Sequence, residues 1–439
     1  MTHVRLGVNV LGVGCHPGAW RSGEVAPAAL YDVEYFRRVA RIAERGTLDA
    51  IFLADQPGLQ ELPVQRPPMT SLEPTVVLAA IAAATERIGV VATASTSYNE
   101  PFNIARRIVS LDHVSGGRAG WNAVTTYSPT ASANFGSAAP ASHDDRYGRA
   151  DEFLTVAKAL WDSWADDALV GDVDQGTYAD AERIEPIDHV GEHFSVRGPL
   201  NVPRSPQGRP VLVQAGGSEQ GRALAAKHAE AVFTSQLTLE SGQAFYADLK
   251  ARAARAGRNP DGVLILPGLT TVIGGTEAEA RARYERLEEL AGGSGSLWQL
   301  GLTFGLDVDE LDLDAPLPLE QIAPRAALQS SHGFQDAFLS LARQGLTVRQ
   351  IVTRFASGHR LAIGAPEQIA DTIERWVRER AADGFNLMPD VFPTGLEAFV
   401  DHVVPELRRR GLLRSEYEGT TLRDHLGLAR PAPADAVAA

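Results

Sequence analysis

Residues 88–126, IGVVATASTSYNEPFNIARRIVSLDHVSGGRAGWNAVTT, contain two apolar segments separated by a helical one. The first segment, Ile88 to Thr96, and the last, Arg118 to Thr126, have the composition of buried strands. Between them, Phe102 to Val114 carries apolar residues at helical spacing and ends at Gly116-Gly117. A strand, a helix and a second strand in succession are typical of a parallel sheet with crossover helices.

The same alternation continues on both sides of this unit. Upstream strands are expected at Leu6 to Leu11 and Asp49 to Asp55, and downstream strands at Pro210 to Gly216, Ala231 to Gln236, Leu264 to Ile273 and Gly384 to Pro389. Helices are expected at Asp32 to Gly46, Pro74 to Arg87, Asp145 to Trp164, Ser218 to His228, Leu239 to Ala256, Glu277 to Leu290, Ala365 to Ala382 and Leu396 to Arg410. Eight strands, each followed by a helix, favour an α/β fold of the closed (β/α)8 TIM-barrel type over an open doubly wound sheet.

Two long insertions interrupt the alternation, over about residues 165–208 and 292–360. Both lie in connections that follow strand ends, which is where barrel enzymes build their active sites. The second insertion contains a helical stretch from Thr347 to Phe355. We expect residues 1–428 to form a single barrel domain and the Pro/Ala-rich tail, 429–439, to be disordered.

Composition excludes several classes of protein. The 439 residues include 41 Lys and Arg against 55 Asp and Glu, a net charge of −14, and no basic run that would neutralise phosphates. We therefore expect no nucleic-acid or membrane partner. The longest apolar stretch, Val76 to Ala84, is about half of a membrane span, and no secretory signal is visible. Cys15 is the only cysteine, which excludes internal disulfides and cysteine-based zinc sites and suits a cytoplasmic enzyme.

The segment VLVQAGGSEQGR, residues 211–222, is the strongest candidate for an anion site. An apolar strand leads into two glycines, Gly216 and Gly217, and Ser218 begins a helix. Glycines allow an anion to approach the backbone closely, and the free N–H groups of a helix start point towards it. A simple turn capped by Ser218 explains the same residues equally well.

Polar residues also stand at the ends of three earlier strands. Asp55 ends the second strand, Thr93 lies late in the third, and Asn122 lies on the fourth. Because the carboxyl ends of barrel strands meet at one mouth, these side chains favour ligand contacts over core packing.

His143 and Tyr147 lie four residues apart at a helix start, so they share one face of that helix. With Asn122, two rings and an amide would suit an aromatic ligand that forms hydrogen bonds. The residues alone favour a simpler interpretation, in which His143 caps the helix and Tyr147 packs under a loop.

His16 follows the first strand and is a candidate acid or base at the mouth, since the pKa of histidine is normally about 6.5. The alternative is a loop histidine without a role, beside a small buried Cys15. Other motifs fail: His189 and His193 enclose a glycine in a loop context that argues against a zinc helix, and no metal site is expected. Gly12-Val-Gly14 lacks the third glycine of a dinucleotide fingerprint.

Taken together, the sequence resembles the bacterial-luciferase-like flavin monooxygenases, in the branch of the nitrilotriacetate, EDTA, dibenzothiophene-sulfone and long-chain-alkane monooxygenases. The similarity extends from about residue 5 to 427. It is carried in order by FLAD (52–55), RRIVSLDHVSGGR (106–118), GWNAVT (120–125), NFG (134–136), HDDRY (143–147), ADEFL (150–154), LWDSW (160–164), HVGEHF (189–194), GPL (198–200), QAGGSEQG (214–221), GFN (384–386) and VPEL (404–407).

The resemblance implies that FMN lies across the barrel mouth. Matching positions place Asp55 and Thr93 towards its ring system, Asn122 at the ring edge, His143 and Tyr147 along the ribityl chain and phosphate, and Gly217 and Ser218 on the phosphate. It thus reverses the simpler interpretation of His143 and Tyr147. It also implies catalytic roles for Asn122 and His143, and for His16 as an N-terminal histidine acting on substrate.

The activity implied is that of a two-component monooxygenase. A separate NAD(P)H:flavin reductase would supply reduced FMN (FMNH2), which reacts with O2 to give a C4a-(hydro)peroxyflavin that oxidises a small organic substrate. A homodimer or homotetramer is also implied. His332 or His359 of the second insertion would reach the substrate, and the sequence does not choose between them. Two alternatives stay open: a deazaflavin-dependent oxidoreductase on the same barrel, and a flavin-binding protein without turnover.

Overall fold

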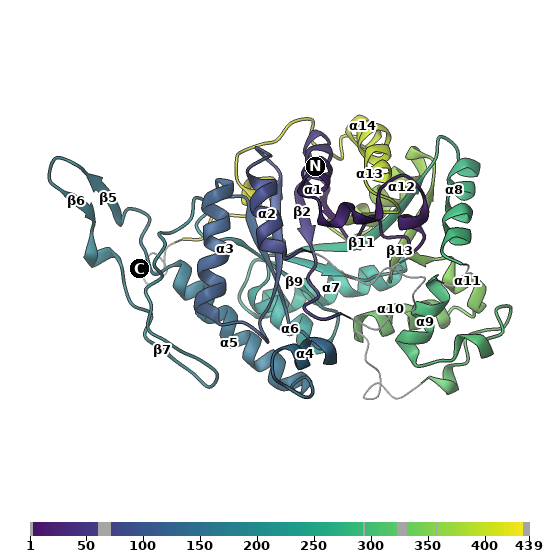
Figure 1. Ribbon diagram of the computed structural model, residues 1–439, viewed down its shortest axis with the longest axis horizontal. Coiled ribbons are helices and arrows are strands. Elements are labelled where there is room, and N and C mark those ends of the chain that lie inside the picture. Colours follow the sequence, from purple (N-terminus) through teal and green to yellow (C-terminus); the bar gives the residue numbers. More distant parts are fainter. Residues whose placement is uncertain (1–2, 60–71, 293–294, 323–331, 357, 433–439) are drawn as a thin grey trace.

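The computed structural model describes residues 3–59, 72–292, 295–322, 332–356 and 358–432. Its centre is a closed barrel of eight parallel strands (Figure 1). The strands are β1 (Arg5–Asn9), β2 (Ala50–Leu53), β3 (Gly89–Ser95), β4 (Ala119–Val124), β9 (Val211–Ala215), β10 (Ala231–Thr234), β11 (Leu264–Ile273) and β14 (Gly384–Pro389). Strand β1 pairs with both β2 and β14, and β10 pairs with β11, so the ring has no free edge. The expected (β/α)8 fold is confirmed.

Helices surround this barrel, and each lies close to its predicted position. The principal ones are α1 (Val33–Arg45), α2 (Pro74–Ala82), α3 (Pro101–Ser115), α5 (His143–Trp161), α6 (Glu219–His228), α7 (Leu239–Arg255), α8 (Glu277–Leu290), α12 (Pro366–Arg378), α13 (Thr394–Ala398) and α14 (Val404–Arg409). Local chemistry sets their starts: the Asp32 carboxylate accepts a hydrogen bond from the backbone N–H of Glu34, and Pro366 occupies the first turn of α12. A π-helical turn, Phe399–Val403, joins α13 to α14 within the last predicted helix.

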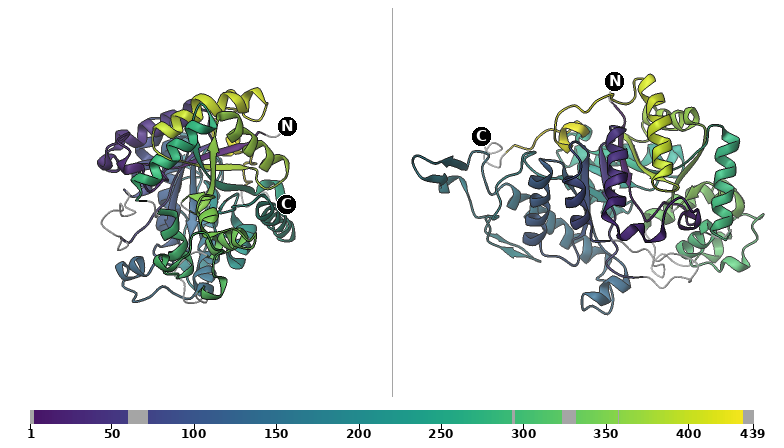
Figure 2. Two further views of the ribbon diagram at one scale, coloured as in Figure 1. Left: turned by 90° about the vertical axis from the view of Figure 1, so that its right-hand side faces the viewer. Right: turned by 45° about the horizontal axis from the view of Figure 1, so that its top comes forward.

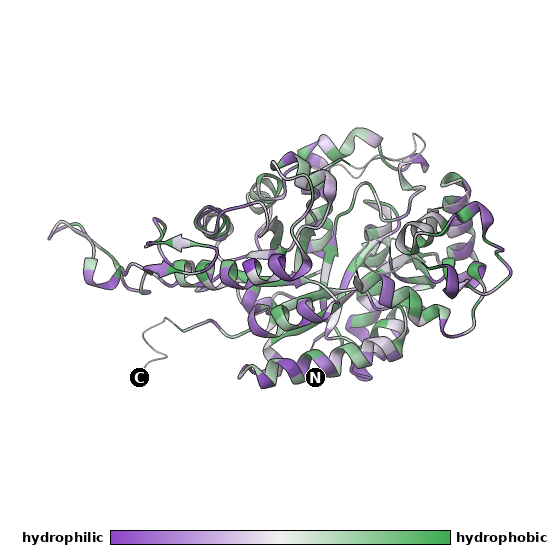
Figure 3. Cartoon of the chain, turned by 90° about the horizontal axis from the view of Figure 1, so that it is seen from below, coloured by the Kyte–Doolittle hydropathy of each residue, from purple (hydrophilic) through white to green (hydrophobic). Residues whose placement is uncertain are grey.

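Successive side chains of each strand point alternately outward, into a core under the helices, and inward, into a core in the barrel lumen. Outward-facing side chains such as Leu6, Val8 and Ile51 pack under the helices, whose outer faces are hydrophilic (Figure 3). Inward-facing Val91 and Val213 fill the lumen together with Leu422 of the short helix α15 (Leu422–Leu426). Leu422 would contact a side chain at Gly89 or Gly120, so α15 closes the end where the strands begin. The opposite end is the mouth.

The first insertion forms two hairpins that project from the body, at the left of Figure 1 and again in the right panel of Figure 2. They consist of β5 (Leu169–Asp172) with β6 (Thr177–Ala179), and β7 (His189–Val190) with β8 (Ser195–Val196). Glu152 of α5 holds the second hairpin: it accepts a hydrogen bond from the His193 backbone N–H and lies 2.8 Å from His189 Nε2. The His189 side chain is therefore the partner of a carboxylate, and His193 contacts the same carboxylate through its backbone.

The second insertion builds a small helical unit with its own apolar core, beside the mouth (Figure 1). Its elements are α9 (Gly295–Phe304), α10 (His332–Ala342), α11 (Val348–Val352), β12 (Phe355–Ala356) and β13 (His359–Gly364). Only α11 was expected, and it is shorter than the predicted stretch. Strand β13 pairs in parallel with β11 beyond the point where β10 ends, which the sequence did not indicate. Helix α4 (Pro129–Asn134), between the strand predicted to end at Thr126 and the helix predicted from Asp145, was not expected either.

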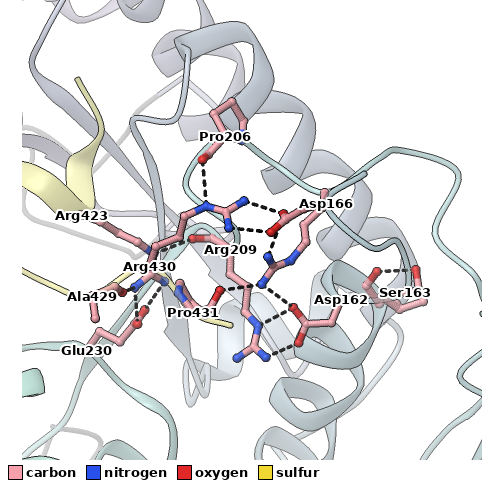
Figure 4. Close-up of polar contacts among 12 residues, drawn as sticks. Asp162, Ser163, Asp166, Pro206, Arg209, Glu230, Arg423, Ala429, Arg430 and Pro431 are labelled. Carbon is pink, nitrogen blue, oxygen red and sulfur yellow. Dashed lines mark hydrogen bonds and ion pairs between the residues drawn. The ribbon is translucent and has the colours of Figure 1, made fainter. Parts of the chain in front are cut away.

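The start of the C-terminal tail is bound to the body, which differs from the expected disorder from residue 429. Arg430 pairs with Asp166, and the Pro431 carbonyl accepts a hydrogen bond of 2.9 Å from Arg204 (Figure 4). Arg209 and Arg204 also pair with Asp162. The carboxylates of Asp162 and Asp166, which follow α5, therefore form ion pairs with several arginines. Residues 433–439 lie outside the described residues. Within the part of the chain that the structure describes, no helix is both long and apolar enough to cross a bilayer.

Candidate active site

Asn122 and Thr93 are brought together at the mouth. They are register partners on the neighbouring strands β4 and β3, and both side chains are buried. Asn122 Nδ2 donates a hydrogen bond of 3.0 Å to Thr93 Oγ1, while Asn122 Oδ1 is buried without any partner. A buried acceptor without a donor costs free energy, so a ligand N–H that reached Asn122 Oδ1 at the mouth would be stabilised.

Asp55 follows β2 at the same end of the barrel and is half-buried. Burial raises the pKa of its carboxyl, and the nearby Glu73 carboxylate raises it further, against the lowering effects of the Gln56 backbone N–H and of Arg107. The carboxyl therefore holds a proton more readily than an exposed aspartate. In its protonated form it can donate a hydrogen bond as well as accept one.

A second group joins the start of α5 to the start of α6. The ring of His143, the first residue of α5, lies with its centroid 4.7 Å from that of Tyr147. Tyr147 in turn accepts a hydrogen bond of 3.4 Å at its hydroxyl from Ser218 Oγ. Three of the predicted residues, His143, Tyr147 and Ser218, thus form one cluster. His143 does not cap α5, because Ser142 is the N-cap residue.

The glycine turn before α6 has the geometry of an anion cradle. Ser218 is the N-cap and accepts a hydrogen bond of 3.0 Å from the Gly221 backbone N–H. A Cβ at Gly216 would lie 2.7 Å from Gln214 Nε2, and one at Gly221 would lie 3.2 Å from the Tyr147 hydroxyl. Bare backbone at Gly216 and Gly217 would let an anion approach the start of α6, where the Gly221 N–H is already bonded to Ser218.

His16 has a different environment from the one expected. Its ring is buried; Nδ1 accepts a hydrogen bond of 3.1 Å from the Gly18 backbone N–H, and Nε2 lies 2.9 Å from Glu288 Oε1 on α8. Because Nδ1 is an acceptor, Nε2 carries the hydrogen and donates a hydrogen bond to Glu288 Oε1. The Tyr284 ring meets the imidazole edge-on at 5.5 Å. These contacts tie His16 to α8, and a role on substrate stays a prediction.

Sequence reasoning missed Asn9, and it left His359 and His332 as alternatives. Asn9 ends β1 in register with Phe52, and its buried Oδ1 has no partner. His359, one of the two histidines left open, is buried at the start of β13 against Phe233. The side chain of His332 lies outside the described residues. The alternation of inward and outward side chains along β1 and β2 would have placed Asn9 and Phe52 inside the barrel. No sequence pattern indicated strand β13.

No cluster of three metal-ligating side chains occurs within the described ranges. The site is instead a set of hydrogen-bonding groups around the mouth, with a glycine turn and a helix start suited to an anion at one side. This donor set fits a flat heteroaromatic ligand that carries a phosphate.

The family model of luciferase-like monooxygenases matches residues 13–384. The chain belongs to this family. Among its curated relatives is nitrilotriacetate monooxygenase component A of Aminobacter aminovorans, which is 47% identical over 95% of both chains. The expected family and branch are confirmed, and the chain is a monooxygenase.

Solved structures of luciferase-like proteins agree with the fold. EDTA monooxygenase from Chelativorans sp. BNC1 superposes with a TM-score of 0.81 at 38% identity, covering 98% of this chain and 99% of its own. A riboflavin lyase described with modified FMN has a TM-score of 0.83 at 32% identity, covering 98% and 97%. Family membership and these relatives support a flavin as the cofactor of this class of barrel.

Proposed function

We propose that the protein is the oxygenase component of a two-component system, which binds reduced FMN at the barrel mouth and uses O2 to oxidise a small organic substrate. One observation carries the proposal: the unpartnered Asn122 Oδ1 and the Ser218 cradle occur at the same end of the barrel. A neutral acceptor for a ring N–H and an anion site for a phosphate are the two features that FMN requires.

The residues present fit FMN in the following way. Gly217, Ser218 and Tyr147 would hold the phosphate, with His143 along the ribityl chain. Asn122, Thr93 and Asp55 would meet the ring system, where Asn122 Oδ1 gains the donor that it lacks. Hydrogen bonds already orient Asn122, Thr93, Ser218 and Tyr147, so these side chains need little ordering on binding.

Bound reduced FMN supplies the reaction with O2 that oxygenates the substrate. The protein's part is to exclude water from the mouth and to hold the ring edge by hydrogen bonds, because water access favours release of H2O2. We infer that Asn122 and His143 serve this purpose. The substrate would belong to the range known from the branch, such as an aminopolycarboxylate, a sulfone or an alkane.

The reduced flavin would come from a separate NAD(P)H:flavin reductase. The chain contains no dinucleotide fingerprint of its own. The relative from Aminobacter aminovorans is itself described as component A, which supports a partner component here. A single buried cysteine suits the reducing cytoplasm, where such a reductase operates.

Dependence on a reductase tests this proposal. We expect the purified protein with FMN to leave NADH and NADPH unoxidised, and an unrelated flavin reductase to start oxygen consumption. We also expect FMNH2 to bind more tightly than reduced riboflavin, because riboflavin lacks the phosphate. Saturable NADH oxidation without reductase, or equal affinity for the two reduced flavins, would contradict the proposal.

A further inference from the structure

A cavity of about 650 Å³ lies at the mouth end of the barrel, and none of the residues assigned to FMN lines it. Its walls come from the loop after β3 with the first turn of α3, from α4 and the loop that follows it, from the start of α5, and from the hairpin of β7 and β8. Cavities of this size hold small organic ligands. The cavity is therefore a candidate binding site separate from the proposed flavin site.

Arg146 of α5 brings a positive charge to this cavity without a carboxylate to balance it. Its Nη1 donates a hydrogen bond to the Ala141 carbonyl, and its Nε is buried without a partner in the described part of the chain. Burial lowers the pKa of the guanidinium, and the groups that raise it are three phenols, those of Tyr147, Tyr98 and Tyr127. An arginine remains charged in such a setting, so its charge is available to an anion.

The other charged groups that line the cavity already have partners. Glu100 lies 3.8 Å from Arg149, and Arg149 also donates a hydrogen bond to the Thr96 carbonyl. The Asp145 carboxylate accepts a hydrogen bond of 2.6 Å from Ser142 Oγ. These contacts use the two carboxylates and the second arginine within the protein. The charge of Arg146 stays uncompensated.

Two serine hydroxyls in the lining also lack partners. Ser132 of α4 is completely buried, and its Oγ forms no hydrogen bond with any described residue. The same holds for the buried Oγ of Ser97, which follows β3. A buried polar group without a partner costs free energy, and a hydroxyl can donate to an oxyanion. Two hydroxyls and one guanidinium thus form a donor set for an anion with several oxygens.

An aromatic stack supplies the apolar part of the wall. The rings of Tyr98 and Phe135 lie 4.7 Å apart with their planes only 3° from parallel, and half of Phe135 is exposed. The stack joins the loop after β3 to the end of α4. A bare phosphate would fill only a small part of the cavity, whereas an organic group attached to it would reach this surface.

We propose that this cavity is a second anion site, which binds a phosphate monoester. Arg146, Ser97 and Ser132 hold the phosphate, and the organic group lies against the stack of Tyr98 and Phe135. Three donor side chains match the three terminal oxygens of a monoester, and in a chain of net charge −14 a cation is needed to attract a dianion. The inference goes beyond the proposed function and does not depend on it, because none of these side chains is assigned to FMN.

Phenyl phosphate, a flat ring that carries a phosphate, is the probe. Its binding to the full-length protein is measured by calorimetry in phosphate-free buffer without oxygen, with no flavin and again with one equivalent of reduced FMN. We expect binding in both conditions, about 2- to 10-fold tighter than that of inorganic phosphate because of the stack. No binding without flavin would overturn the proposal, as would binding that one equivalent of reduced FMN abolishes.

Variants assign the binding to the cavity. Arg146→Gln should weaken phenyl phosphate binding about 10-fold or more, because a charge-assisted contact is lost. Phe135→Ala, at a half-exposed position, should leave inorganic phosphate unaffected and remove the advantage of phenyl phosphate. Arg106→Gln makes the same change of net charge at an exposed position of α3 and is the control, which should bind as wild type does. Equal binding by wild type and Arg146→Gln would overturn the proposal.

The anion cradle at Ser218 is tested separately. Ser218→Ala should leave phenyl phosphate binding unchanged, and a loss confined to this variant would overturn the second site. A failure of reduced FMN to bind the wild type counts against the proposed function alone, because the probe is also titrated without flavin. Excess reduced FMN identifies the source of the phosphate. A second equivalent that phenyl phosphate displaces supports a flavin as the occupant, and a single equivalent with phenyl phosphate bound beside it supports a different monoester.

Discussion

Replacing Asn122 with leucine separates ligand binding from folding. In the wild type, Nδ2 donates to Thr93 at 3.0 Å, while the buried Oδ1 has no partner. Leucine has a similar size and removes both groups. Loss of the bond to Thr93 costs about 0.5–1.5 kcal/mol, and removal of the unpartnered acceptor returns about 1–3 kcal/mol. The free energy of unfolding should therefore stay within about 2 kcal/mol of wild type, or rise.

The same substitution should weaken flavin binding, although it leaves the free energy of unfolding nearly unchanged or raises it. If Asn122 Oδ1 accepts a ring N–H, the Asn122→Leu variant leaves that donor buried and unpaired, at a cost of about 1–3 kcal/mol. The dissociation constant for reduced FMN should then rise about 5- to 150-fold. Urea unfolding gives the first quantity, and anaerobic fluorescence titration gives the second.

Asn386→Leu is the matched control. Asn386 is also buried with an unpartnered Oδ1, but it lines the lower lumen beside Leu422. Its replacement should leave the affinity for reduced FMN unchanged. The reasoning is refuted if Asn122→Leu binds reduced FMN as tightly as wild type, or if both variants lose affinity equally.

Three further predictions concern other parts of the molecule. Ser218→Ala removes a hydroxyl from the anion cradle and should reduce the preference for FMN over riboflavin; an unchanged ratio of dissociation constants would argue against the cradle. Arg430 and Arg204 hold the pKa of Asp166 at about 2, so the folded state resists protonation there; stability from this pair is present above the ordinary aspartate range and is lost as the pH falls towards 2. The melting temperature of Asp166→Asn should accordingly fall less than that of wild type over this range, and parallel curves would contradict the pairing. Leu422→Ala should cost about 2–5 kcal/mol of unfolding free energy and leave flavin binding intact, because Leu422 is fully buried at the far end of the lumen.

The barrel could be predicted from sequence because its strands are buried on both faces. Such strands appear as continuous apolar runs between amphipathic helices, and all eight runs were found where the structure has them. The short elements gave no such signal. Strand β13 lies within an insertion, and its pairing partner β11 is far away in sequence. Helix α4 consists of residues that also suit a loop.

Parts of the site were predictable for a similar reason. Asn122 and Thr93 follow from strand ends, and His143 with Tyr147 from helical spacing, all of which are local patterns. The environment of His16 depends on Glu288, a contact across 272 residues that no local pattern reveals. His359 reaches the barrel only because a glycine on another strand leaves space for it.

Rapid mixing tests the central claim most directly. The protein is saturated with reduced FMN without oxygen and is then mixed with oxygenated buffer in a stopped-flow spectrometer, in the absence of substrate. A flavin oxygenase that excludes water from its mouth should show an oxygen adduct of the flavin that decays far more slowly than free reduced FMN reoxidises, and His143→Ala should shorten its lifetime. Reoxidation at the rate of free reduced FMN, with no intermediate absorbance and a full yield of H2O2, would contradict the account.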